Sequence, residues 1–356
     1  VGVGRAVSAG LAAAPCTAAG RGELRRKWGG KMKKVIAIGE LLIDFVPQQK
    51  GCALDEVTHF ERVAGGAPAN VAMAVARLGG RSAMLSQVGE DAFGTHIIKT
   101  LRQAGVDTAG VFRTAQANTG LAFVSLDAAG NRSFSFYRNP SADLYLEESQ
   151  ITPAMFADSA ALHFGSVDLV DWPVRQAHRR AIGLAKQAGA LVSFDPNVRL
   201  PLWGSAADCQ AAIRAFLPCA DLVKLSDEEL EFVTGCTEEC AAAERLFAEG
   251  CRLLLVTRGA AGAAAYTPQT QACIPAVPVP VADTTGAGDA FAGAFLYQLA
   301  RDGVTADMLT ALSAAQLTAY LTFSARYASL TVQKKGAVMA AMEELRAAYP
   351  DEKNCT

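Results

Sequence analysis

The residues best suited to chemistry lie in one short run, Gly286-Ala287-Gly288-Asp289. A glycine turn that opens a helix leaves backbone N–H groups unpaired, and the helix dipole adds positive charge, so Gly286, Ala287 and Gly288 could form an anion hole for phosphate. Asp289 beside that hole could take a proton from an attacking hydroxyl. An anion hole next to a base is what phosphoryl transfer to an alcohol requires. Taken alone, such a run is more often an ordinary turn with an acidic first helical turn.

A second group of residues is suited to binding a polyol. In open α/β sheets, ligands bind beyond the carboxyl ends of the strands. Asp44 follows one strand candidate and could accept hydrogen bonds from sugar hydroxyls. Gly65 and Gly66 would let the backbone approach a ligand, and Asn70 can both donate and accept to a diol. A solvated turn and an ordinary loop-to-helix junction are the alternative readings of these positions.

A third group is suited to phosphate and nucleotide. Asn197 and Arg199 follow one strand candidate, and Arg199 could hold a phosphate or a carboxylate. Lys224 could contact the phosphates of ATP, and Glu229 could orient water on Mg²⁺. The glycine turn 257–262 could let a nucleotide approach the backbone. A helix cap at Ser-Asp-Glu-Glu and a plain β-turn remain the alternatives.

Composition excludes several classes of function. The chain has 356 residues, of which 51% are hydrophobic and 19% charged, with a net charge of −2. That balance supports a large buried core and does not suggest binding to nucleic acid or an anionic membrane. No apolar run is long enough to cross a bilayer. The nine cysteines are scattered, which indicates reduced thiols in a cytoplasmic protein.

The elements that must position these residues alternate along the chain. Short apolar runs predict strands at 35–38, 82–88, 161–164, 191–194, 222–224 and 253–257. Helical patterns lie at 68–78, 94–104, 174–188, 207–216, 228–234 and 241–249. This order predicts an α/β fold with a mostly parallel sheet covered by helices on both faces. Two stretches, about 45–64 and 118–140, instead predict a small β-sheet, with a hairpin around 127–130, that acts as a lid.

The first 31 residues show no periodicity, and the first predicted strand follows Met32. We therefore expect residues 1–31 to be a non-native or disordered leader and Met32 to be the start. A signal peptide or an organellar transit peptide are the alternatives.

Two motifs carry a family resemblance: Gly65-Gly-Ala-Pro-Ala-Asn-Val-Ala72 and Asp283-Thr-Thr-Gly-Ala-Gly-Asp-Ala-Phe291. Together they resemble the ribokinase-like, PfkB-type carbohydrate kinases over residues 33 to about 345. Within that family, 39–44, 194–199 and 224–230 look most like bacterial fructokinases. The resemblance implies a Rossmann-like core in one kinase domain, 32–350, with a tail at 351–356. It also implies ATP-dependent phosphorylation of a sugar primary hydroxyl, most consistent with fructose.

The resemblance also implies roles for residues. Asp289 would be the general base beside the anion hole. The sugar would lie near Asp44, Gly65, Gly66, Asn70 and Arg138, and ATP along Asn197, Lys224, Glu229, Thr257, Gly259, Gly262 and Gly336. Mg²⁺ is implied as a cofactor, and K⁺ could bind near Asp283 and Thr285. The chain departs from the family pattern at Ser226, where an Asn is usual, and at Ala325, where an Asn near the adenine is often found.

Three alternatives remain open from the sequence. A 2-keto-3-deoxygluconate kinase would use Arg138 and Arg199 to clamp the substrate carboxylate. A nucleoside kinase would leave the fructokinase-like strand ends unexplained. A catalytically inactive sugar-binding protein could keep the same fold. The edge of the lid sheet could also pair two subunits in a homodimer.

Overall fold

The computed structural model describes residues 32–49, 51–126 and 132–354; the expected leader 1–31 and the hairpin turn lie outside them. Among these residues, the main sheet has nine strands in the order β13-β12-β11-β10-β9-β8-β1-β4-β5. The strands are β1 (Lys34–Ile38), β4 (Ser82–Gly89), β5 (Asp107–Thr114), β8 (Ser159–Phe164), β9 (Leu191–Phe194), β10 (Leu222–Ser226), β11 (Leu253–Thr257), β12 (Ala263–Tyr266) and β13 (Gln271–Ile274). All neighbours pair in parallel except β11 with β12 and β12 with β13. The predicted fold class is confirmed.

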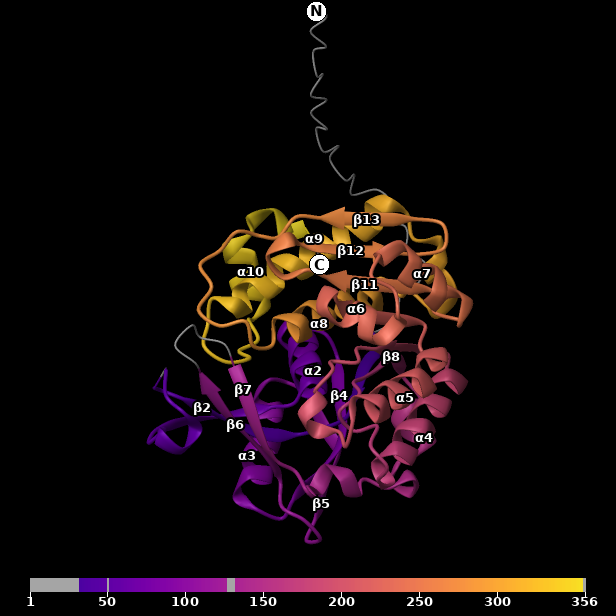
Figure 1. Cartoon of the computed structure of the whole chain (residues 1–356). Helices are drawn as coiled ribbons and strands as arrows, with labels where there is room; N and C mark the ends of the chain where they lie inside the picture. Colours follow the sequence, from indigo (N-terminus) through magenta and orange to yellow (C-terminus); the bar gives the residue numbers. More distant parts are fainter. Residues whose placement is uncertain (1–31, 50, 127–131, 355–356) are drawn as a thin grey trace, which may run out of the picture. The chain divides into compact units, whose positions relative to one another are not determined.

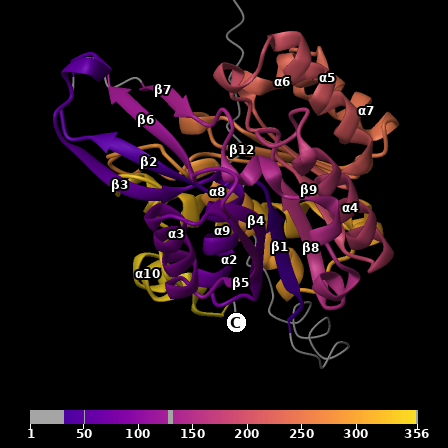
Figure 2. The same cartoon turned by 90° about the horizontal axis from the view of Figure 1, so that it is seen from below.

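Helices cover both faces of this sheet. They are α2 (Ala67–Arg77), α3 (Ala92–Gln103), α4 (Pro173–Gln187), α5 (Ala206–Phe216), α6 (Asp227–Thr234), α7 (Glu239–Ala248), α8 (Ala287–Arg301), α9 (Ala314–Val332) and α10 (Met342–Ala348). In β1, Val35 and Ala37 pack with α2, α8 and α9, whereas Ile36 and Ile38 pack with α4 to α7. Successive strand residues point to opposite faces, and helices cover both, which is why β1 is apolar from Val35 to Ile38 (Figures 1 and 2).

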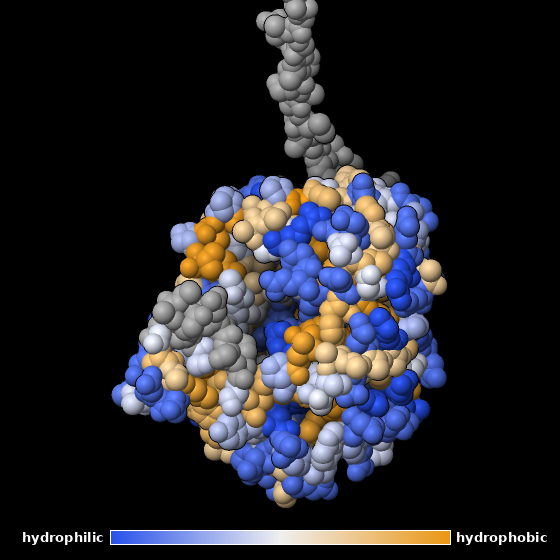
Figure 3. All heavy atoms as spheres, in the orientation of Figure 1, coloured by the Kyte–Doolittle hydropathy of each residue, from blue (hydrophilic) through white to orange (hydrophobic). Residues whose placement is uncertain are grey.

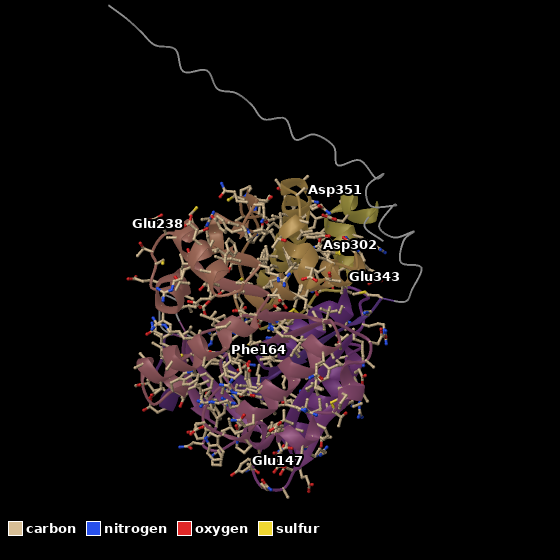
Figure 4. The ribbon with its side chains drawn as sticks, turned by 90° about the vertical axis from the view of Figure 1, so that its right-hand side faces the viewer. Glu147, Phe164, Glu238, Asp302, Glu343 and Asp351 are labelled. Carbon is tan, nitrogen blue, oxygen red and sulfur yellow. The ribbon has the colours of Figure 1, made fainter. Side chains whose placement is uncertain are left out.

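The core reaches the carboxyl ends of the central strands. Phe164, labelled in Figure 4, ends β8 and stacks on Phe194 at the end of β9, with ring centroids 4.5 Å apart. Both side chains are fully buried, so these strand ends are firmly held. The loops that follow them start from fixed positions. No described helix combines the length and apolar character needed to cross a membrane.

Helix α8 lies inside the protein. Its residues from Ala290 to Ala300 are all buried, and it packs against α2, where a Cβ added to Gly293 would lie 2.6 Å from Ala74 Cβ (Figure 1). Glycine therefore lets the two helices approach closely. The first turns of α2 and α8, which carry the predicted sugar and catalytic residues, are positioned by this contact.

The described residues also form a second, smaller sheet in the order β3-β2-β6-β7. Its strands are β2 (Leu42–Pro47), β3 (Phe60–Gly65), β6 (Gly120–Leu126) and β7 (Arg132–Tyr137). Phe45 of β2 stacks on Phe123 of β6, with ring centroids 4.8 Å apart. Figure 2 shows this sheet to one side of the main sheet. The small sheet predicted from the alternating pattern is present, and its action as a lid stays a prediction.

Candidate active site

The anion hole predicted at the start of α8 has the backbone geometry of a tight turn. Gly286 has φ 74°, in the left-handed region, and a Cβ there would lie 2.6 Å from Ala337 Cβ. Only glycine adopts this conformation without strain or collision. The N–H of Ala287 donates to the carbonyl of Thr284 at 3.2 Å, so the N–H groups that follow it in the first turn are the ones available to an anion.

Asp289 lies in this first turn and is partly buried. The side-chain amide of Asn70 donates to its Oδ2 at 2.8 Å, although the two residues are 219 positions apart. Burial raises the pKa of Asp289 to about 6, with Asp195 adding to the rise, while the Asn70 hydrogen bond and Lys224 oppose it. The carboxylate is therefore ionised at neutral pH and more basic than an ordinary aspartate, as a general base should be.

This pKa predicts the pH dependence of the reaction. Asp289 can accept a proton only when ionised, so kcat/KM should fall roughly tenfold per pH unit below about pH 6. Rates at saturating and limiting sugar between pH 5 and 8.5 would check this. An acid limb near pH 4, the ordinary range of an aspartate, would contradict the assignment of Asp289 as the base.

Asn70 occupies the first turn of α2 and is 5% exposed. Its amide nitrogen contacts Asp289, whereas its Oδ1 is buried without a hydrogen-bond partner among the described residues. A buried acceptor without a partner is costly unless a ligand or water supplies a donor. Asn70 thus presents an acceptor next to the base, as expected for a residue that binds a sugar hydroxyl.

The loop before Asn70 is packed tightly enough to require its glycines. Gly66 has φ 115°, and a Cβ there would lie 2.3 Å from the carbonyl oxygen of Glu40. Asp44 Oδ2 would lie 2.2 Å from a Cβ on Gly65. The carboxylate of Glu40 accepts a hydrogen bond from Ala67 N at 2.8 Å. The structure therefore brings Asp44, Gly65, Gly66 and Asn70 together, and it adds Glu40, which the sequence analysis assigned no role.

Lys224 lies on the other side of the anion hole. Its ammonium pairs with Asp195 Oδ2 at 2.9 Å, and it would lie 3.0 Å from a Cβ on Gly288. Burial lowers the pKa of Lys224, but Asp195 and Glu229 outweigh burial and raise it, so the ammonium stays charged. Asp195 was missed as a site residue, although it belongs to the strand-end motif that contains Asn197 and Arg199.

Glu229 joins the loop after β9 to the start of α6. Its carboxylate accepts from Val198 N at 2.6 Å and from Ser226 N and Oγ, each at 2.9 Å. Glu229 thus caps α6, as the alternative reading of the sequence proposed, and it also orients the loop of Arg199.

Asn197 in this loop has φ 47°. Arg199 is close enough for its positive charge to act to lower the pKa of Asp289.

A cavity of about 590 Å³ adjoins the anion hole. Thr257, Gly259 and Gly262 line it on one side, and Ala287 and Gly288 line it on another. The remaining walls are mostly apolar and include Val277, Val279, Phe291, Ala325, Ala328 and Val332. The volume and lining suit a flat heterocycle with its phosphates at the anion hole. Figure 3 shows the surface hollowed over the region where Figure 1 draws the start of α8, with hydrophilic side chains at the bottom of the hollow.

Asp283 ties the segment before α8 to the segment after α9. Its Oδ1 accepts from Thr285 N and Oγ1, both at 2.7 Å, and its Oδ2 accepts from Gly336 N at 2.8 Å. Gly336 is thereby placed beside the segment 283–285, which leads into the predicted anion hole. Lys224, Asn197, Glu229 and Gly336 do not line the 590 Å³ cavity itself. Lys224 adjoins it through Gly288, and Gly336 is held by Asp283 just before α8.

Arg138 does not have the free guanidinium that binding of a substrate carboxylate would require. It is buried, and its guanidinium pairs with Asp143 and, at 2.6 Å, with Asp168. Neither aspartate was predicted from the sequence, because nothing in their spacing indicates that they meet Arg138.

The described residues hold no group of three or more His, Cys, Asp or Glu side chains that could bind a metal ion by themselves. Mg²⁺ usually keeps several waters and binds through one or two carboxylates together with substrate phosphates. The carboxylate of Glu229, whose negative charge acts on Lys224 beside Gly288, fits that mode of binding.

Comparisons with known proteins agree with this geometry. Residues 32–344 match the family described as pfkB family carbohydrate kinase. Fructokinase-2 of Solanum habrochaites is 43% identical over 308 residues, which is 86% of this chain and 92% of that protein. The crystal structure of fructokinase with bound ATP from Xylella fastidiosa has a TM-score of 0.82 and 36% identity over 90% of this chain and 99% of that one. A double mutant of Vibrio cholerae O395 fructokinase, in a fructose, ADP and potassium ion bound form, has a TM-score of 0.78 and 34% identity, covering 89% of this chain and 98% of that one.

Proposed function

We infer, since the chain belongs to the pfkB family of carbohydrate kinases, that it is an ATP-dependent fructokinase that makes fructose 6-phosphate. The observation that carries the mechanism is the contact of Asn70 with Asp289, which directly follows two residues, Ala287 and Gly288, that line a nucleotide-sized cavity. A hydroxyl-binding amide, a base and an anion hole then converge on one point. Those three groups are what transfer of a phosphoryl group to an alcohol needs.

In the proposed reaction, Asp44, Gly65, Gly66 and Asn70 hold the sugar with its primary hydroxyl at Asp289. The hydroxyl oxygen forms a bond to the γ-phosphorus of ATP as its proton passes to Asp289. The bond between that phosphorus and the β,γ-bridging oxygen breaks, and ADP leaves. The first-turn N–H groups of α8 and the ammonium of Lys224 stabilise the charge that develops on the phosphoryl oxygens.

Two metal ions are proposed to assist. Mg²⁺ would bind the phosphates of ATP through water held by Glu229, and it would supply positive charge to the leaving group. K⁺ would bind beside Asp283 and Thr285, where the carboxylate already organises the loop before the anion hole. The potassium ion bound form of the Vibrio cholerae fructokinase supports potassium as the ion of this proposal. Replacing K⁺ by a large organic cation in the assay should then lower activity.

The main alternative substrate is 2-keto-3-deoxygluconate. It requires a cation for its carboxylate, and Arg138 is already paired with Asp143 and Asp168. The identity of 43% to a fructokinase also supports fructose. Both observations favour a neutral sugar over a sugar acid.

We also propose that the protein forms a homodimer through the small sheet. Among the described strands, β3 and β7 end that sheet, so each carries an unpaired backbone edge. Tyr137 at the end of β7 is 64% exposed. Light scattering should give twice the chain mass of 37.2 kDa, and a mass equal to one chain would exclude the dimer.

The test of the function is sugar-dependent release of ADP by the full chain. Fructose, 2-keto-3-deoxygluconate, ribose, glucose and adenosine would each be supplied with Mg-ATP and K⁺. Turnover with fructose alone is the expected result. Turnover with the keto acid instead would transfer the assignment to a sugar acid kinase, and the absence of turnover with every substrate would leave an inactive sugar-binding protein.

A further inference from the structure

A buried charged cluster lies next to the segment Gly65–Asn70, which is called the sugar loop below because it holds the predicted sugar-binding residues. It consists of Arg138, which follows β7; Asp143, in the 3-10 helix Ala142–Tyr145; Asp168, which follows β8; and Glu40, between β1 and β2. Their exposed fractions are 8%, 1%, 1% and 4%. Four segments far apart in sequence therefore place one guanidinium and three carboxyl groups in the interior.

Hydrogen bonds and close packing connect this cluster to the sugar loop. Glu40 accepts a hydrogen bond from Ala67 N at 2.8 Å, directly after Gly66. A Cβ on Gly120 would lie 3.1 Å from Arg138 Cγ. Gly120 pairs with Leu42, and Leu42 pairs with Gly65 across the small sheet. Arg138 thus packs against Gly120 of the small sheet. Gly120 lies in the same cross-strand row as Leu42 and Gly65, and Gly65 belongs to the sugar loop.

Two polar atoms of the cluster have no hydrogen-bond partner among the described residues. Arg138 Nη2 donates to both Asp143 and Asp168, and Ser141 Oγ donates to Asp143. Arg138 Nε and Asp168 Oδ2 remain buried and unpaired. One is a donor and the other an acceptor, and they belong to side chains that touch each other. A hydroxyl group can accept from the first and donate to the second, so the pair suits a polyol.

The charges of the cluster do not suit an anion. Burial lowers the pKa of Arg138, but Asp143 and Asp168 outweigh burial and raise it, so the guanidinium is permanently charged. Burial raises the pKa of Glu40 to about 7 and raises that of Asp168, with Arg138 opposing both rises. The positive charge of Arg138 is already paired with Asp143 and Asp168, so it is balanced within the protein. A substrate carboxylate brought here would meet like charges in a desolvated site, which is a strong basis for rejection.

We propose that Asp143 and Asp168 are specificity-determining residues, which hold Arg138 so that this subsite binds hydroxyl groups of a neutral sugar and rejects sugar acids. The inference rests on the proposed function, because it assumes that the sugar loop binds the phosphoryl acceptor. It assigns the selection of substrate to carboxylates that surround the arginine.

The variants Asp143→Asn and Asp168→Asn keep the size of each side chain and remove one negative charge. Each should raise the ratio of kcat/KM for 2-keto-3-deoxygluconate to that for fructose by roughly tenfold or more, because Arg138 gains an unbalanced charge. Asp171→Asn is the matched control, since the side chain of Asp171 is 97% exposed and lies outside the cluster. A ratio within about twofold of the wild-type value in both cluster variants, at unchanged melting temperature, would overturn the proposal.

A second measurement needs no variant and therefore does not depend on how the variants fold. In a crystal structure of the wild-type protein with fructose, sugar hydroxyls should lie within hydrogen-bond distance of Arg138 Nε and Asp168 Oδ2. A bound sugar that contacts neither atom would overturn the inference and leave the kinase assignment intact. Failure of the wild-type protein to phosphorylate fructose would instead count against the proposed function.

Discussion

Replacement of Asp289 by asparagine should lower kcat by roughly 10² to 10⁴, the usual contribution of a general base. Asparagine keeps the shape of the side chain, and its carbonyl can still accept the hydrogen bond that Asn70 donates at 2.8 Å. The sugar loop should stay in place, so KM for fructose should change little. A variant that retained near-wild-type turnover would remove Asp289 from the role of base.

The same substitution should not lower stability, which separates loss of chemistry from loss of fold. The pKa of Asp289 is raised to about 6 in the folded protein, so above that pH its ionised form is less favourable in the folded than in the unfolded chain. Asparagine removes this cost, and the melting temperature at pH 8 should be equal or higher. Asp307→Asn is a suitable control, because the side chain of Asp307 is 88% exposed.

Replacement of Lys224 by methionine should lower both activity and stability. Loss of its ammonium beside Gly288 removes a positive charge from the phosphoryl site, and kcat should fall roughly 10²-fold or more. Asp195 would be left buried without its partner, which typically costs about 3–5 kcal/mol of stability. Denaturant unfolding and steady-state kinetics with varied ATP would measure the two effects.

The double variant Lys224→Met with Asp195→Asn separates these effects. Neutralising Asp195 removes the buried unpaired charge, so stability should recover in part, while activity should not. Lys186→Met, at an exposed position of α4, controls for the loss of a lysine as such. Recovery of activity together with stability would show that Lys224 acts only through the fold.

The sequence predicted best those elements whose own residue pattern is enough to specify their secondary structure. The central strands β1, β4 and β8 to β11 are buried on both faces and rich in branched residues, so their apolar runs predicted them within a few positions. The edge strands β5 and β13, and β12 next to β13, were missed. Their sequences, such as the run Ala263–Tyr266, contain mostly alanine or polar residues and become strands through pairing with their neighbours.

The candidate site likewise contains residues that the sequence could predict and residues that it could not. Gly286 and Asp289 sit in one motif, and the glycine turn predicted there is present, with Gly286 at φ 74°. The partners of Arg138 could not be predicted, because Asp168 is 30 residues away and reaches it only after the small sheet and the main sheet have formed. Residue types indicate what chemistry is available, whereas long-range packing decides which charges are already balanced.

The pairing of Asn70 with Asp289 across 219 residues has a consequence for the time at which activity arises. During synthesis, the sugar loop leaves the ribosome long before α8 does. A nascent chain or fragment that ends between residues 225 and 285 would hold Asn70 and Lys224, but neither Asp289 nor the glycine turn that opens α8. Under the proposed mechanism, such incomplete copies could not consume ATP, and activity would arise only once nearly the whole polypeptide has been made and folded.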